Sequence, residues 1–146
     1  MKSSKQNKDS GLDIQNNKSM GSLKKSKNPI SIDVKNLIVE YDNGHRTTTA
    51  VNNASFQIND NEFTVILGSS GSGKTSLLNA VGGMLSPAGG NIIYKGKDIT
   101  KFSNRDYINY RKTEIGFIFQ NYNLLPDLTA KDNIIVASSL IKDPIP

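Results

Sequence analysis

The sequence contains no cysteine and no tryptophan, and it has a single histidine among 146 residues. The absence of cysteine excludes a disulfide framework, a thiolate metal site and a cysteine nucleophile. Long hydrophobic runs are missing too, since no apolar segment approaches the roughly 18 residues of a membrane-spanning helix. The lysines near the start are not followed by the apolar segment of a secretory signal. Any association with a membrane is therefore expected to come through a partner or a surface contact.

The positive charge of the chain is concentrated at its start. The net charge is +5, and residues 1–28 hold seven lysines and two aspartates, so residues 29–146 are neutral as a group. The first segment is dominated by Lys, Ser and Asn and cannot bury enough apolar surface to offset the entropy of ordering. We therefore expect a disordered basic tail over 1–28 and one ordered domain over 29–146. The scattered lysines favour a solubilising extension over a tether to lipid headgroups or nucleic acid.

One motif stands out in the ordered part. Residues 68–75 read GSSGSGKT and fit the pattern G-x-x-x-x-G-K-[ST] of phosphate-binding loops. Glycines let successive backbone N–H groups point toward one centre, and the start of the following helix adds unpaired N–H groups and partial positive charge. Lys74 is placed to reach the β- and γ-phosphates, and the Thr75 hydroxyl to ligate Mg²⁺. The expected binding residues are Gly68, Ser69, Ser70, Gly71, Ser72, Gly73, Lys74, Thr75 and Ser76.

The residues around the motif favour a phosphate site over a flexible Gly/Ser linker. Residues 62–67 predict a buried strand, and apolar residues recur after the loop at helical spacing, with Gly82-Gly83 indicating close packing or an early helix end. Elsewhere the patterns predict strands over 30–41, 47–58 (broken at Asn52-Asn53), 91–96 and 115–119, and helices over 103–112 and 130–141. An Asn-Gly turn joins the first two strands into a hairpin. The whole predicts an α/β fold.

Two flanking features narrow the family. Tyr41 closes a strand ahead of the loop, and residues 115–130 read IGFIFQNYNLLPDLTA. Together with the loop, they resemble the ATP-binding domain of an ABC transporter, most closely the lipoprotein-releasing, macrolide-export and antimicrobial-peptide-export subfamily. The resemblance covers residues 30–146. It implies a P-loop NTPase core with a mostly parallel sheet, an antiparallel β subdomain, and ATP and Mg²⁺ as cofactors.

The resemblance also implies roles for particular residues. Tyr41 matches the aromatic residue that stacks on adenine, and Gln120 matches the glutamine that ligates Mg²⁺ or orients the attacking water; Lys74 and Gln120 are then the catalytic candidates. The loop after Gln120 touches the membrane permease, toward which Leu124, Leu125 and Leu128 would present an apolar ridge. A second ATP-binding domain is the expected dimer partner. The implied location is cytoplasmic, at the inner face of the membrane through a permease.

Parts of the family pattern are missing from the sequence. No Leu-Ser-Gly-Gly signature, no apolar strand ending in Asp-Glu and no downstream switch histidine follow Gln120. We interpret the chain as the N-terminal part of such a domain, truncated before those motifs, which binds ATP but hardly hydrolyses it, because phosphoryl transfer depends on positioning and charge stabilisation.

The sequence leaves two alternative functions open and disfavours two others. A non-enzymatic nucleotide-binding regulatory module and a soluble ABC-type ATPase acting on nucleic acid or ribosomes stay open, although no specific nucleic acid is expected. A small GTPase is disfavoured because Asn-Lys-x-Asp is absent. A dinucleotide dehydrogenase is disfavoured because the third glycine of its motif is not in register.

Overall fold

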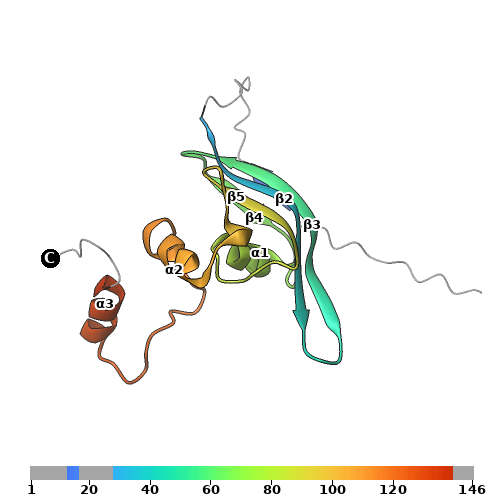
Figure 1. Cartoon of the computed structure of the whole chain (residues 1–146). Coiled ribbons are helices and arrows are strands. Elements are labelled where there is room, and N and C mark those ends of the chain that lie inside the picture. Colours follow the sequence, from blue (N-terminus) through green and yellow to red (C-terminus); the bar gives the residue numbers. More distant parts are fainter. Residues whose placement is uncertain (1–12, 17–27, 140–146) are drawn as a thin grey trace, which may run out of the picture. The chain divides into compact units, whose positions relative to one another are not determined.

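The structure is a computed structural model that describes residues 13–16 and 28–139. The chain divides into two compact units, residues 1–101 and 102–146, and each is described by itself (Figure 1). None of the helices in the described residues is long and apolar enough to cross a membrane.

The first unit is built on a four-stranded antiparallel sheet with the order β3-β2-β5-β6. Its strands are β2 (Ile30–Asp42), β3 (Thr47–Asn59), β5 (Gly89–Tyr94) and β6 (Lys97–Asp98). The long β2–β3 hairpin projects from the rest of the unit (Figure 1). At its turn, Gly44 has a φ of 82°, and the Asn43 side chain accepts hydrogen bonds from the backbone of His45 and Arg46. The predicted hairpin and its Asn-Gly turn are confirmed.

The pairing of β2 with β3 is irregular near its middle. Register shifts occur between Val34 and Leu37 and again between Leu37 and Val39. Asn36 and Asn53 adopt positive φ values of 49° and 57° there, a conformation that asparagine tolerates better than most residues. The prediction that Asn52-Asn53 would break the second strand was wrong, because the strand absorbs the irregularity as a bulge and continues.

The core of the first unit lies between the sheet and α1 (Lys74–Val81). Both elements contribute side chains that are at most 4% exposed: Val34, Leu37, Val39, Val51, Leu77, Ala80 and Ile92. The helix ends at Val81 with Gly82 as its C-cap, and the backbone N–H of Gly83, at a φ of 67°, donates to the carbonyl of Ala80. The early helix end that the glycine pair suggested is thus observed. A short 3-10 helix, η1 (Ile99–Lys101), follows β6 and closes the unit.

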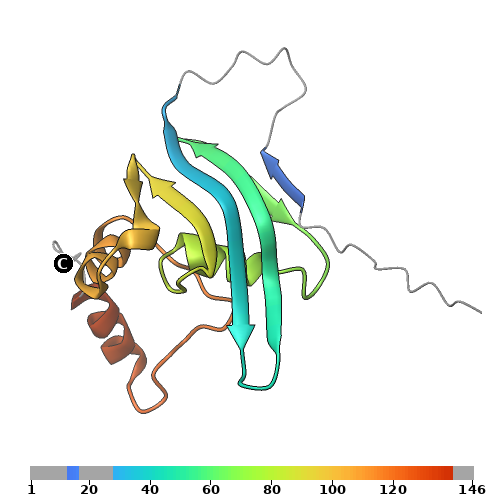
Figure 2. The same ribbon diagram turned by 45° about the vertical axis from the view of Figure 1, so that its right-hand side comes forward.

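The strand before the phosphate loop differs from its prediction. β4 (Thr64–Leu67) pairs in antiparallel register with β1 (Asp13–Asn16), as Figure 2 shows. We predicted a buried strand over 62–67, but the strand begins at Thr64, and Phe63 and Leu67 are 74% and 46% exposed. The reason is that β1 is the only strand paired with β4 in the described residues, which gives β4 no place in a wide, covered sheet.

The pairings also bear on two other expectations. All strand pairings of the described residues are antiparallel, so the antiparallel subdomain is seen directly, whereas no parallel pairing of the predicted core sheet occurs in this part of the chain. β1 falls within the segment for which the sequence predicted disorder, and these four residues form a strand instead. The remaining tail residues, 1–12 and 17–27, lie outside the described residues.

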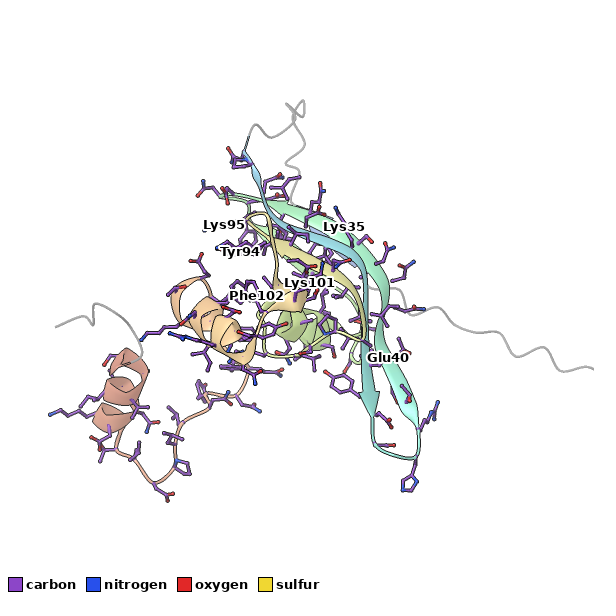
Figure 3. The ribbon with its side chains drawn as sticks, in the orientation of Figure 1. Lys35, Glu40, Tyr94, Lys95, Lys101 and Phe102 are labelled. Carbon is purple, nitrogen blue, oxygen red and sulfur yellow. The ribbon has the colours of Figure 1, made fainter. Side chains whose placement is uncertain are left out.

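Two capped helices lie in the described part of the second unit, residues 102–139. α2 (Asn104–Thr113) has Ser103 as its N-cap. The Ser103 hydroxyl accepts from the backbone N–H of Asp106, and the Asp106 carboxylate accepts from the backbone N–H of Ser103. This capping box confirms the predicted N-cap. Before the helix, the ring of Phe102 (labelled in Figure 3) makes edge-to-face contacts with Tyr107 and Tyr110.

The stretch between these helices was predicted incorrectly. Residues 115–119 form no strand, and Ile118 is 99% exposed. Strand structure requires a hydrogen-bonded neighbour, and this stretch pairs with no strand of the described residues. α3 (Ala130–Ser139) follows, close to the predicted helix over 130–141, whose last two residues lie outside the described part.

Candidate functional site

The phosphate loop joins β4 to α1, and two of its glycines adopt left-handed backbone conformations. Gly71 has a φ of 78° and Gly73 a φ of 93°. A Cβ atom on Gly73 would collide with the backbone carbonyl of Ala50 on β3, whereas nothing lies within 4 Å of the same position on Gly71. Gly73 is therefore required both by its dihedral angles and by the close approach of a neighbouring strand.

The start of α1 differs from the starts of the other two helices. Gly73 occupies its N-cap without any side-chain hydrogen bond, and no acidic residue lies in the first turn. In contrast, side chains cap α2 and α3, where Ser103 and Thr129 accept from the backbone N–H groups of Asp106 and Asp132. The first N–H groups of a helix need an acceptor, and the partial positive charge there favours an anion. The start of α1 thus offers donors that no side chain satisfies.

Lys74, the first residue of α1, folds back over the loop. Its Nζ donates to the carbonyl oxygens of Gly68 at 2.9 Å and Ser69 at 2.6 Å, and it lies 3.4 Å from Oγ of Ser72. The ammonium group has three donors, so these partners use them all within the loop. The lysine thereby closes the loop into a ring beside the start of the helix. For Lys74 to bind a phosphate, phosphate oxygens would have to replace these carbonyl oxygens as acceptors of its hydrogen bonds.

A small open cleft lies at this ring. Its volume is about 180 Å³, and it is lined by Ala50 and by residues 71–76. Pockets that enclose a whole drug-sized ligand have volumes of about 300–1,000 Å³, so this cleft suits a chain of phosphates better than a complete nucleotide. Ser72, only 8% exposed, is the buried polar residue of its wall. Any base attached to such a phosphate chain would lie outside the cleft.

Tyr41 lies beside this cleft. It stands near the end of β2, is 45% exposed, and donates a hydrogen bond from its hydroxyl to Oγ of Ser76 at 3.1 Å. Because Ser76 lines the cleft, this hydrogen bond brings the tyrosine to its rim. The structure therefore brings together Tyr41 and the loop residues that the sequence singled out. The hydrogen bond itself joins residues 35 positions apart, and no sequence pattern predicted it.

The remaining candidates of the family resemblance lie in the second unit. Gln120 is exposed, and its place relative to the loop stays a prediction. Leu124, Leu125 and Leu128 are 65%, 48% and 38% exposed, so they are not core residues of the described unit. Their exposure is what a ridge that meets a partner requires.

A Mg²⁺ site would have to be built from few protein ligands. Within residues 13–16 and 28–139, no group of three or more His, Asp or Glu side chains could hold a metal ion. Mg²⁺ is commonly bound through one or two protein groups together with substrate phosphates and waters. The exposed hydroxyl of Thr75, on the wall of the cleft, fits this mode of binding. The donor set thus suits Mg²⁺ that arrives with phosphates rather than a metal held by protein alone.

Comparison with known protein families decides the family. A family model described as "ABC transporter" matches residues 51–144, which is more than half of the chain. The chain belongs to the ABC transporter ATP-binding family. This membership confirms the resemblance drawn from the loop, Tyr41 and residues 115–130.

Two curated members of the ABC family illustrate the similarity. The chain is 37% identical over 113 residues to the "Putative ABC transporter ATP-binding protein MG065 homolog" of Mycoplasma pneumoniae, covering 77% of this chain and 24% of that protein. It is also 37% identical over 110 residues to the "Putative hemin import ATP-binding protein HrtA" of Staphylococcus haemolyticus, covering 75% of this chain and 49% of that one. The chain thus spans about a quarter of the length of the first relative and about half of the second.

Two solved ABC structures share the fold. Both are dimeric structures of the ATP-binding cassette MJ0796, one of them in a post-hydrolysis state bound to ADP and Pi. Their TM-scores are 0.67 and 0.68 at 26% and 28% identity, over 79% of this chain and 50% of theirs. The fold class of a P-loop NTPase with an antiparallel β subdomain is confirmed by these neighbours.

Proposed function

We propose that residues 68–76 bind the triphosphate of Mg·ATP and that Tyr41 stacks on its adenine ring. The observation that carries this proposal is the start of α1, which has no side-chain cap and opens onto the cleft with Lys74 as its first residue. An anion there meets unpaired N–H groups, the helix dipole and an ammonium group at once. The neighbour solved with ADP and Pi supports a nucleotide as the ligand of this family.

In this proposal, residues of the cleft bind the phosphates and Mg²⁺, and Tyr41 beside it binds the base. Lys74 releases the carbonyl oxygens of Gly68 and Ser69 and donates to phosphate oxygens, exchanging neutral acceptors for charged ones. The Thr75 hydroxyl holds Mg²⁺, which would neutralise phosphate charge when bound. Gly71 and Gly73 keep the backbone close to the phosphates. The half-exposed Tyr41 ring offers a face to the base outside the cleft.

We further propose that ATP binding here energises a membrane permease. Gln120 would reach the bound Mg²⁺ or the attacking water, and the exposed leucines Leu124, Leu125 and Leu128 would contact the permease. The dimeric cassettes among the neighbours support a second ATP-binding domain as a partner. The chain would then lie peripherally at the inner face of the membrane. The relative whose name specifies hemin import supports a transport role without indicating the cargo of this chain.

Calorimetric titration of the whole chain with Mg·ATP tests the binding site. We expect Lys74→Ala to weaken binding on the order of ten- to a hundredfold, because a charge-assisted hydrogen bond contributes about 1.5–3 kcal/mol. Lys97→Ala is the matched control, since it removes an exposed lysine of β6 outside the cleft. Equal affinities of the two variants, both folded by circular dichroism, would contradict the proposal.

Hydrolysis is a separate question, and we propose that the 146-residue chain turns ATP over negligibly. The sequence has no apolar strand ending in Asp-Glu after Gln120, and phosphoryl transfer relies on such groups for positioning and charge stabilisation. Phosphate release measured with purified protein tests this. Steady release that disappears in Lys74→Ala would show that the chain is an ATPase by itself.

A further inference from the structure

We propose that Ser76 positions Tyr41 and thereby couples the base-binding side of the site to its phosphate-binding side. The inference rests on the proposed function. It gives a specific task to the hydrogen bond between Tyr41 and Ser76, which joins two protein side chains and does not include the nucleotide. Tyr41 belongs to β2, Ser76 to the first turn of α1, and the hydrogen bond between their hydroxyls is 3.1 Å long.

The hydrogen bond settles the direction of a side chain that is otherwise weakly held. Tyr41 is 45% exposed and stands one residue before the end of β2, next to the projecting hairpin. A half-exposed side chain at such a place has several accessible rotamers, and stacking on a base requires one of them. With its hydroxyl on Ser76, the ring is held at the wall of the cleft. The entropy of orienting the ring is then lost on folding and not on binding.

The chemistry of the serine hydroxyl allows it to serve both sides of the site. A hydroxyl has one hydrogen to donate and can accept two hydrogen bonds. Tyr41 donates to Ser76, so the hydrogen of Ser76 stays available, and the described residues give the Ser76 side chain no other hydrogen bond. Because Ser76 lines the cleft, it can donate that hydrogen to a phosphate oxygen. Hydrogen bonds in such a chain reinforce one another, which links the orientation of Tyr41 to the presence of phosphate.

The coupling predicts different effects on the binding of the base and on the binding of the phosphates. Inorganic tripolyphosphate with Mg²⁺ carries the phosphate chain without a base, so the ratio of its Kd to that of Mg·ATP reports what the base side contributes. We expect Tyr41→Phe, which keeps the ring, to lower this ratio about two- to tenfold, the range of one hydrogen bond. Tripolyphosphate should lose less affinity than Mg·ATP in this variant, because it loses only the reinforcement of the hydrogen bond from Ser76 and no oriented ring.

Ser76 variants complete a double-mutant cycle, measured by calorimetry on the whole chain. Ser76→Ala should lower the ratio as much as Tyr41→Phe does, and the double variant should lower it no further. Ser76→Thr retains the hydroxyl and should restore the ratio. A residue that only supported folding would weaken both ligands alike and leave the ratio unchanged. Circular dichroism confirms that each variant is folded.

The outcomes separate this inference from the proposed function. If Lys74→Ala binds tripolyphosphate as tightly as the unmodified chain, the phosphate site itself is wrong. If Lys74→Ala loses binding but the ratio is unchanged in Tyr41→Phe and Ser76→Ala, the site stands and the coupling is overturned. A higher ratio in Tyr41→Phe would also overturn it, because the hydrogen bond would then hold the ring away from the base. Additive losses in the double variant would show that the two residues act independently.

Discussion

The backbone carbonyl of Ala50 lies so close to Gly73 that no side-chain carbon fits between them. Ala50 belongs to β3 and Gly73 is the N-cap of α1, so the antiparallel sheet contacts the phosphate loop at the point where the loop becomes a helix. The left-handed φ of 93° adds a second reason for glycine at this position. The shape of the loop therefore depends on β3, a strand that lies outside the phosphate-loop motif in the sequence.

The first prediction compares two glycines of the same loop. Gly71→Ala should destabilise the chain by about 1–2 kcal/mol, the usual penalty for a left-handed non-glycine residue, because its surroundings are open. Gly73→Ala should cost clearly more, since β3 or α1 must also move. The free energy of unfolding in urea measures both, and nucleotide titration should show a larger loss for Gly73→Ala. Equal destabilisation by the two variants would mean that the Ala50 contact relaxes freely.

The second prediction concerns a pair of glycines outside the site. Gly90 and Gly96 both have a φ of 80°, but a Cβ on Gly90 would collide with the backbone of Lys35 and Asn36, whereas Gly96 has open space. Gly90→Ala should therefore be the less stable variant by at least about 1 kcal/mol, because backbone atoms cannot move aside cheaply. Urea unfolding again measures this. Similar urea midpoints of unfolding for the two variants would contradict this prediction.

Much of the fold follows from signals that are local in the chain. The Asn-Gly turn specifies the β2–β3 hairpin, and Ser103 with Asp106 specifies the start of α2, because turn and cap chemistry acts within a few residues. The loop motif identified the cleft for the same reason, since the glycines and Lys74 that form it are contiguous. These elements could be predicted without any knowledge of the tertiary structure.

The elements that the sequence did not predict depend on distant partners. Residues 115–119 have the composition of a buried strand, yet a strand exists only where another strand pairs with it. The pairing of β1 with β4 joins segments about 50 residues apart, and the hydrogen bond from Tyr41 to Ser76 joins two further elements. No periodicity or turn signal encodes such contacts. The tyrosine itself was identified through its family role, not through its contact.

The third prediction concerns acid stability and Asp98. Burial raises the pKa of the Asp98 carboxyl, but hydrogen bonds from Thr100 and Asn91 and the nearby Lys101 lower it by more, so the pKa lies below its ordinary value of 3.8. A depressed pKa in the folded state stabilises the protein above the unfolded-state pKa, and this contribution is lost as the pH falls through the folded-state pKa.

The experiment for Asp98 is urea unfolding between about pH 6 and pH 2. Asp98→Asn should be less stable than the unmodified chain at pH 6, because its amide keeps one oxygen to accept from Thr100 but places an N–H donor where the carboxylate accepts from Asn91 and pairs with Lys101. The difference should shrink below about pH 4, as protonation removes the same interactions from the unmodified chain. A difference that stays constant across this range would show that the carboxylate's charge does not stabilise the fold.

The last prediction concerns Asn133, which ties the loop after Gln120 to α3. Its Oδ1 accepts from the backbone N–H of Leu125 at 2.8 Å, and its Nδ2 donates toward the carbonyl oxygens of Leu125, Leu128 and Thr129 at 3.0–3.2 Å. A primary amide supplies an acceptor oxygen and two N–H donors at the same time, so it holds the exposed leucines in a single arrangement.

Asn133→Asp should loosen this loop more than Asn133→Ala, because a carboxylate keeps the acceptor for Leu125 but turns its second oxygen toward carbonyl oxygens. We expect the backbone amides of Leu125 and Leu128 to exchange hydrogen roughly five- to tenfold faster in Asn133→Ala, the equivalent of about one hydrogen bond, and faster still in Asn133→Asp. Ser138→Ala is the matched control and should leave these rates unchanged, because the Ser138 hydroxyl, on the same helix, donates only to the backbone carbonyl of Ile135. If these backbone amides exchanged as slowly in Asn133→Asp as in the unmodified chain, the N–H donors of the Asn133 side chain would have no part in ordering the exposed leucines.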